Sequence, residues 1–248
     1  MDKKKIIKYL VTTYVITWIF WGIRAALTSF DILPYDNAII WILYALGSLG
    51  PTVAAISLLE DKSLKGIKDF IFNHKKGTII YFLYFLAIYT LTFYCSTFKI
   101  AEGTTLVNAI IHGIIFIIVG GGNEELGWRG ILQPELEKKF SNFITSCIIT
   151  IPWSLWHIPF WFTKGDMHQE VPFLLFVFAV FAMGIIAGAI KKTTNSVFYC
   201  VLFHGLSNLV EEVCAYETNY KLYIGFALIL ISTIYVSRMK PKKEEEII

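Results

Sequence analysis

Long apolar segments dominate this 248-residue chain and restrict what it can fold into. A bilayer core about 30 Å thick needs about 20 apolar residues per helix. A hydrophobic fraction of 56% with only 17% charged residues is too apolar for a water-soluble globule of this size. The sequence therefore predicts an all-α, polytopic membrane protein. The eight candidate segments are Ile6–Ser29, Asn37–Leu59, Thr78–Phe98, Thr104–Gly122, Phe143–Phe162, Val171–Ile190, Ser196–Val213 and Tyr220–Ser237.

The charges between these segments indicate how they cross the membrane. With both termini in the cytoplasm, 17 of the 22 Lys and Arg residues fall in cytoplasmic segments and three in outer loops. Positive charge gathers on the cytoplasmic side of membrane proteins, and seven or nine spans would scramble this division. We therefore expect eight transmembrane helices with both termini cytoplasmic, in the cytoplasmic (plasma) membrane. The basic start leads into an apolar segment that is too long for a signal peptide, so we expect a retained first span.

The loops and the remaining composition exclude several classes of protein. The longest loop, Glu60–Gly77, is too short for a soluble domain, and its lysines predict a segment lying on anionic lipid. A net charge of +3 is too small to indicate a nucleic-acid partner. The four cysteines form no C-x-x-C pair, which favours packing over metal or redox roles. Function is therefore expected inside the helix bundle.

Ionisable residues within a span are costly, about 2.5–3.5 kcal/mol at the bilayer centre, so each needs a partner or a function. The first group lies in Gly120–Gly130, with the sequence GGGNEELGWRG. Its three glycines allow a backbone or a substrate to approach closely. Glu125 and Arg129 are four residues apart and can pair on one helical face. Glu124 then lacks that partner and could face a cavity as a general base. The alternative is a span that ends at Gly122, with these charges at the interface.

Two further polar groups lie in later spans. His157 follows two tryptophans in a span that contains two prolines, and His204 shares a helical face with Asn208. Taken alone, each fits a packing or interhelical role equally well. Counted from the nearest cytoplasmic turn along continuous helices, Glu124, His157 and His204 lie at depths of roughly 15–24 Å. We therefore expect Glu, His, His and Asn to converge on one cavity near mid-membrane.

A glutamate with two imidazoles supports two mechanisms of amide hydrolysis. In one, Glu124 takes a proton from water, His157 and His204 position that water, and Asn208 stabilises the oxyanion. In the other, Glu124, His157 and His204 bind Zn²⁺, which leaves one position for an activated water. The sequence contains no H-E-x-x-H motif and no Asp deep in a span, which excludes zincin-type and aspartyl sites.

These motifs resemble those of the CAAX protease and bacteriocin-processing (CPBP/Abi) family, which includes the type II CAAX prenyl endopeptidases. The resemblance covers about Thr104–Val213, the four-helix core of the family. Three ordered motifs carry it: Glu124-Glu125-x-x-x-Arg129, an aromatic-x-x-x-His from Trp153 to His157, and His-x-x-x-Asn from His204 to Asn208. Trp153 stands where the family more often has Phe, and because it is still a large aromatic residue we expect no consequence.

The resemblance implies a role for each matching residue. Glu124 matches the catalytic glutamate and His157 the histidine of the second motif. His204 and Asn208 match the third motif, with the asparagine as transition-state stabiliser. The other two matches are the accompanying carboxylate, Glu125, and the structural arginine, Arg129. The family is described both with and without a bound metal, so the resemblance leaves the metal open.

We therefore predict an intramembrane endopeptidase, a hydrolase that cuts a peptide or protein substrate, lipid-modified substrates included, near the cytoplasmic side. We expect one integral membrane domain over 1–248, with helices 1–3 in 1–103, the catalytic core in 104–213, and a last helix and tail in 214–248. One alternative is a non-catalytic immunity or regulatory membrane protein that retains the family core. A transporter is disfavoured by the lack of an inverted repeat. Membrane lipid is the expected surrounding partner.

Overall fold

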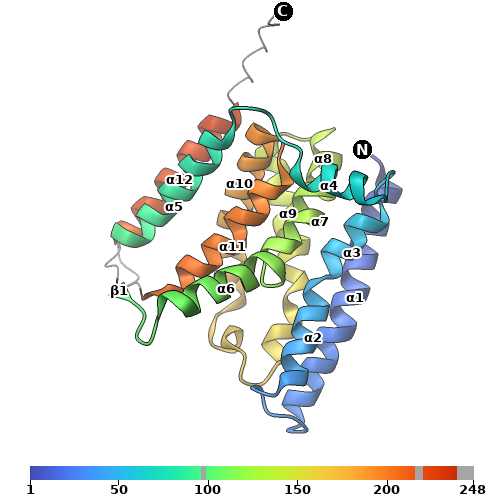
Figure 1. Cartoon of the computed structure of the whole chain (residues 1–248), viewed down its shortest axis with the longest axis vertical. Coiled ribbons are helices and arrows are strands. Elements are labelled where there is room, and N and C mark those ends of the chain that lie inside the picture. The colour runs from blue at the N-terminus through green and yellow to red at the C-terminus, as the bar shows by residue number, and fades with distance from the viewer. Residues whose placement is uncertain (96–98, 216–219, 239–248) are drawn as a thin grey trace, which may run out of the picture.

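The computed structural model describes residues 1–95, 99–215 and 220–238, and nearly all of its regular structure is helical (Figure 1). The longer helices are α1 (Lys3–Ser29), α2 (Ala38–Ser48), α3 (Gly50–Ser57), α4 (Leu64–Phe72), α5 (Ile79–Cys95), α6 (Leu106–Ile118), α9 (Asn142–Trp156), α10 (Phe173–Thr194), α11 (Val197–Val213) and α12 (Tyr220–Arg238). The short elements are β1 (Lys99–Ile100), η1 (Gly122–Glu124), α7 (Glu125–Gly127), η2 (Trp128–Leu132), α8 (Gln133–Glu137), η3 (Ile158–Phe162), η4 (Met167–Glu170) and β2 (Cys214–Ala215).

Each of the eight predicted segments contains helix, which confirms the all-helical class; the end of the third, 96–98, lies outside the described residues. Among the described residues, five helical stretches are long and apolar enough to cross a membrane: Lys3–Ser29, Ala38–Ser57, Leu106–Glu137, Asn142–Phe162 and Phe173–Thr194. Two shorter apolar helices, α5 and α12, accompany them. Helix α11 has 17 residues and carries polar side chains, among them His204, Asn208, Glu211 and Glu212. The count of eight spans and the side on which the termini lie stay predictions, and the predicted tail beyond residue 238 falls outside the described residues.

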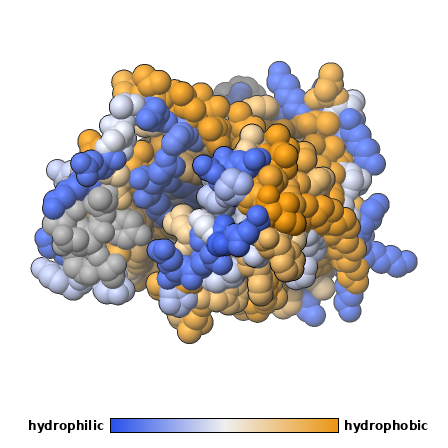
Figure 2. Space-filling view, turned by 90° about the horizontal axis from the view of Figure 1, so that it is seen from below, coloured by the Kyte–Doolittle hydropathy of each residue, from blue (hydrophilic) through white to orange (hydrophobic). Residues whose placement is uncertain are grey.

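The outer surface of the bundle is apolar where lipid would contact it. Along α6, Leu106, Ile110, Ile114 and Ile118 are exposed at four-residue spacing, which places them on one face. Seen from below, hydrophobic side chains cover much of the end of the molecule, and hydrophilic ones form separate groups at its centre and along its edges (Figure 2). The start of α1 and the end of α12 lie at the same end of the bundle (Figure 1). A chain that crosses the membrane an even number of times has its two ends on the same side.

The fourth predicted span does not continue as one helix past the glycines. Helix α6 ends at Ile118, and Gly121 adopts φ +129°, a left-handed conformation that side chains rarely adopt. The chain then forms the single turn η1, the short α7, the π-helical turn η2 and α8. Backbone groups freed at such breaks must be satisfied by neighbouring segments. The stretch between Glu124 and Lys138, along which the depth of Glu124 was counted, lies entirely after this break, so that depth stays a prediction. Because the stretch combines 3₁₀, α- and π-helical turns, its rise per residue is not the uniform value of about 1.5 Å of an α-helix.

Neighbouring helices supply those partners. The hydroxyl of Thr52 donates to the carbonyl of Asn123 at 2.8 Å, and the amide of Asn123 donates to the carbonyl of Ser48 at 2.8 Å. Helices α2 and α3 thus hold the turn that carries Glu124. On the other side, β1 and β2 pair antiparallel and join the start of α6 to the end of α11.

A buried ion pair fastens α1 to the turn after η3. Nη1 of Arg24 lies 2.9 Å from Oδ2 of Asp166, and both side chains are almost completely buried. The ring nitrogen Nδ1 of His168 lies 2.7 Å from the other oxygen of Asp166. Burial alone would raise the pKa of Asp166, but the hydrogen bond with His168 and the charge of Arg24 outweigh it and hold this pKa below its usual range.

We expect Asp166→Asn to lower the stability of the purified protein by about 3 kcal/mol, because it leaves the Arg24 charge buried without its partner. A depressed carboxyl pKa stabilises the fold above the pKa of the unfolded state, about 3.9. This contribution disappears as the pH falls through the lower pKa of the folded state. The difference between the unfolding midpoints of wild type and variant should therefore have its full size at pH 7 and decrease below about pH 4. A gap that stays constant with pH would contradict this assignment.

Candidate active site

Glu124 is buried, with 6% of its surface exposed, and a tryptophan holds it. The indole Nε1 of Trp153, on α9, donates to Oε2 of Glu124 at 2.7 Å. Among the described residues, no hydrogen bond engages Oε1, the other carboxylate oxygen. The predicted general base is thus fixed by one oxygen and has the second available for a ligand.

Glu125 is completely buried and forms the centre of a charged network. Its Oε2 lies 3.2 Å from Nε of Arg129, which confirms the predicted pairing at four-residue spacing. Its Oε1 lies 2.9 Å from Nδ1 of His204 on α11. The first and third motifs are therefore joined directly, through Glu125 rather than Glu124.

Arg129 is held by three different elements. Besides the pair with Glu125, its Nη2 donates to the carbonyl of Gly184 on α10 at 3.3 Å. Its guanidinium lies over the ring of Trp153, 4.5 Å from the centroid, in cation–π geometry. Arg129 is 1% exposed and ties η2 to α9 and α10, as a structural arginine would.

His157 ends α9 and lies among aromatic rings. Its Nδ1 lies 2.8 Å from the carbonyl oxygen of Trp153, one turn earlier. A carbonyl can only accept, so Nδ1 carries the hydrogen, and in the neutral ring Nε2 is left as an acceptor. The rings of Trp156 and Phe176 contact His157, with centroids at 4.6 and 5.0 Å. No direct hydrogen bond joins His157 to Glu124 in the part of the chain that the structure describes.

Helix α11 brings His204 and Asn208 to the break after α6. The Nδ2 of Asn208 donates to the carbonyl of Gly120 at 2.7 Å, which leaves its second hydrogen for a ligand. A Cβ at Gly121 would lie 2.8 Å from Nε2 of His204 and 2.5 Å from Nδ2 of Asn208. The close approach of His204 and Asn208 to the backbone at position 121 therefore requires a glycine there. Gly205, the residue after His204, allows α11 to pack equally closely against α6, because a Cβ at this position would lie 2.6 Å from Cγ1 of Ile117.

All six predicted residues therefore lie around one region, where η1, α7, η2, α9 and α11 meet. Four are joined by direct side-chain contacts or through the ring of Trp153: Glu124, Glu125, Arg129 and His204. His157 joins them through the Trp153 backbone, and Asn208 through Gly120. Sequence reasoning did not foresee the hydrogen-bonding role of Trp153, although the unusual residue at that motif position was visible.

The donor groups do not fit the zinc site that the second of the two mechanisms would require. No set of three or more His, Cys, Asp or Glu side chains is gathered closely enough to hold a metal ion among residues 1–95, 99–215 and 220–238. The spacing of these groups, rather than their individual hydrogen bonds, argues against the metal, because a histidine that binds a metal through Nε2 also commonly donates Nδ1–H to a protein acceptor, as His157 and His204 do here.

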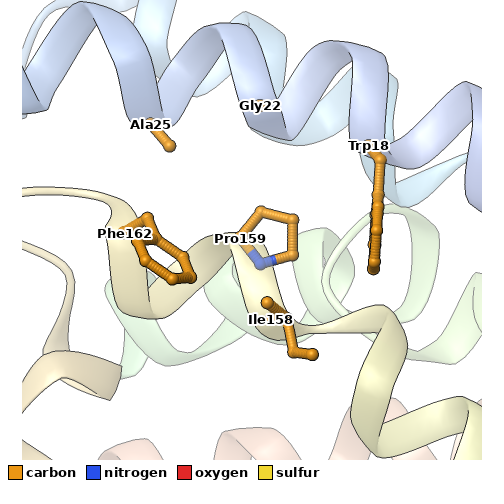
Figure 3. Close-up of a pocket in the computed structure, with 6 residues that line it drawn as sticks. All are labelled: Trp18, Gly22, Ala25, Ile158, Pro159 and Phe162. Carbon is orange, nitrogen blue, oxygen red and sulfur yellow. The ribbon is translucent and has the colours of Figure 1, made fainter.

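A separate apolar groove lies between α1 and η3, with a volume of about 290 Å³ (Figure 3). Trp18, Gly22 and Ala25 line it from α1, and Ile158, Pro159 and Phe162 from η3. One of its lining residues, Ile158, directly follows His157 in the sequence, but none of the six predicted site residues lines the groove. We therefore treat it as distinct from the polar site.

The fold and the buried polar cluster define a multi-pass integral membrane protein with a carboxylate–imidazole site inside its helix bundle. Comparison with known proteins narrows this class. Residues 105–210 match the family model described as type II CAAX prenyl endopeptidase Rce1-like. The chain is also 26% identical over 251 residues to CAAX prenyl protease 2 of Methanococcus maripaludis, an alignment that covers 92% of each protein. These two matches confirm the resemblance that the three motifs predict.

Proposed function

We propose that this protein is an intramembrane endopeptidase that hydrolyses a peptide bond of a protein substrate near the cytoplasmic side of the membrane, with residues 104–213 as its catalytic core. The supporting observation is the buried Glu124 carboxylate, held through one oxygen by Trp153, whose ring packs against His204 and whose carbonyl accepts a hydrogen bond from His157. The name of the relative, CAAX prenyl protease, extends the proposal to prenylated protein substrates. The similarities favour a peptidase over a non-catalytic regulatory protein.

In the proposed mechanism, Oε1 of Glu124 accepts a proton from a water molecule, whose oxygen attacks the carbonyl carbon of the substrate. Once Oε1 takes one hydrogen of that water, one hydrogen remains, and the unprotonated Nε2 of a neutral imidazole, that of His157 or of His204, can accept it as a hydrogen bond. The free amide hydrogen of Asn208 can donate to the oxyanion of the tetrahedral intermediate. Glu124 then delivers its proton to the leaving amine, the C–N bond breaks, and the carboxylate is restored.

The test is cleavage of a peptide library by the detergent-purified protein, read by mass spectrometry, with and without a chelator. A C-terminal CAAX peptide should be included in prenylated form beside its unmodified twin. We expect cleavage that persists after chelation, since the donor geometry does not fit a metal. A preference for the prenylated twin would support the lipid-modified substrate class. No cleavage of any peptide by a folded preparation would contradict the proposed function.

A further inference from the structure

Trp153 contacts four of the six residues of the candidate site. Its indole N–H donates to Glu124, its ring face covers the guanidinium of Arg129, and its backbone carbonyl accepts from His157. Its ring also meets that of His204 edge to face, with centroids 5.4 Å apart. A phenylalanine at this position could reproduce the ring contacts and the carbonyl, but it has no N–H group.

The hydrogen bond from this indole is well placed to fix the carboxylate. Trp153 is 2% exposed and Glu124 is 6% exposed, so water has little access to replace a lost donor. A buried carboxylate without donors is unfavourable, and hydrogen bonds to charged groups are among the stronger ones in proteins. Because Oε2 is engaged at 2.7 Å, the rotation of the carboxylate is restricted and Oε1 has a defined direction.

We propose that Trp153 is a positioning residue for Glu124: its indole N–H holds Oε2 and thereby orients Oε1 towards the water that is to be activated. This inference rests on the proposed function, in which Oε1 takes the proton. Trp153 acts through Glu124 and does not touch the reacting atoms. The departure from the more common phenylalanine therefore has a consequence, in contrast to the expectation from sequence.

The chain offers a matched control on the same helix. Trp156 is completely buried three residues after Trp153, and its ring packs against His157. Its indole nitrogen has no hydrogen-bond partner among the described residues. Trp156→Phe therefore removes an indole of the same size from the same environment without removing a hydrogen bond to a carboxylate. Any loss of activity in Trp153→Phe beyond that in Trp156→Phe can then be attributed to the missing N–H donor to Glu124.

The first measurement is steady-state cleavage of the best library peptide. We expect Trp153→Phe to lower kcat by roughly 10- to 100-fold, as the loss of a hydrogen bond to a charged group would. KM should stay within about twofold of wild type, because Trp153 does not contact the substrate. Trp156→Phe should stay close to wild type. Equal kcat values for the two variants, or a loss carried by KM, would overturn the proposal.

The second measurement depends on neither activity nor the folding of Trp153→Phe. In ¹⁵N-tryptophan-labelled protein, the seven tryptophans each contribute one indole N–H signal. Replacing Glu124 with Gln should shift one of them strongly, because the charged acceptor becomes neutral, and this signal should not be the one removed by Trp156→Phe. If no indole signal shifts, the proposal is wrong. A wild-type protein without peptidase activity that still shows the shift would refute the proposed function and leave the hydrogen bond established.

Discussion

Replacing Glu124 with Gln should abolish peptide cleavage while leaving the yield of folded protein unchanged. Glutamine has nearly the same volume, and its carbonyl oxygen can still accept the indole hydrogen of Trp153. It cannot take a proton from water. Since positioned general bases contribute about 10²–10⁴-fold to rates, we expect activity to fall by a factor on the order of 10⁴. Cleavage rates and thermal unfolding of the purified variant are the two measurements.

The control for this variant is a second buried glutamate outside the site. Glu135 on α8 is 5% exposed and pairs with Lys138 at 2.8 Å. Glu135→Gln removes a buried negative charge of the same kind and should retain cleavage. Activity preserved in Glu124→Gln would remove this carboxylate from the mechanism. A comparable loss in both variants would mean that the effect comes from stability and not from proton transfer.

Much of the fold could be predicted because lipid imposes a length and a polarity on every crossing segment. That constraint locates helices, but it does not describe breaks within them. Ala38–Ser57 is interrupted after Ser48, where Pro51 follows at the start of α3. The fourth segment breaks at Gly121, whose φ of +129° depends on the packing of His204 and Asn208 against it. That packing joins residues more than 80 positions apart, so the three glycines indicate a close approach but do not identify the residues that make it.

The candidate site was predictable in its membership and less so in its connections. The Glu125–Arg129 pair follows from local spacing, and it forms although η2 is a π-helical turn. The contact between Glu125 and His204 depends on how α11 is rotated about its axis relative to α7, which no periodicity within either segment specifies. The partner of Glu124 could not be predicted for the same reason, because Trp153 lies on another helix.

Arg129→Met should be the most destabilising of the variants considered. The substitution keeps the apolar stem and removes the charge, which leaves the completely buried Glu125 with His204 alone. Breaking a buried ion pair by removing one partner costs about 3–5 kcal/mol. For a protein of this length the corresponding fall in the unfolding midpoint is on the order of 10 °C. Thermal unfolding in detergent, followed by circular dichroism, measures it directly.

Two further variants distinguish the loss of the Glu125–Arg129 ion pair from the general effect of removing a positive charge. Lys138→Met breaks an ion pair at three-residue spacing in which the lysine side chain is 53% exposed, and such pairs contribute about 0–1 kcal/mol. The double variant Glu125→Gln with Arg129→Met should be more stable than the sum of its single variants predicts, because neither charge is then left buried alone. Additive losses would show that the two side chains act independently. The 3.2 Å contact would then contribute little to holding the motif segment in place.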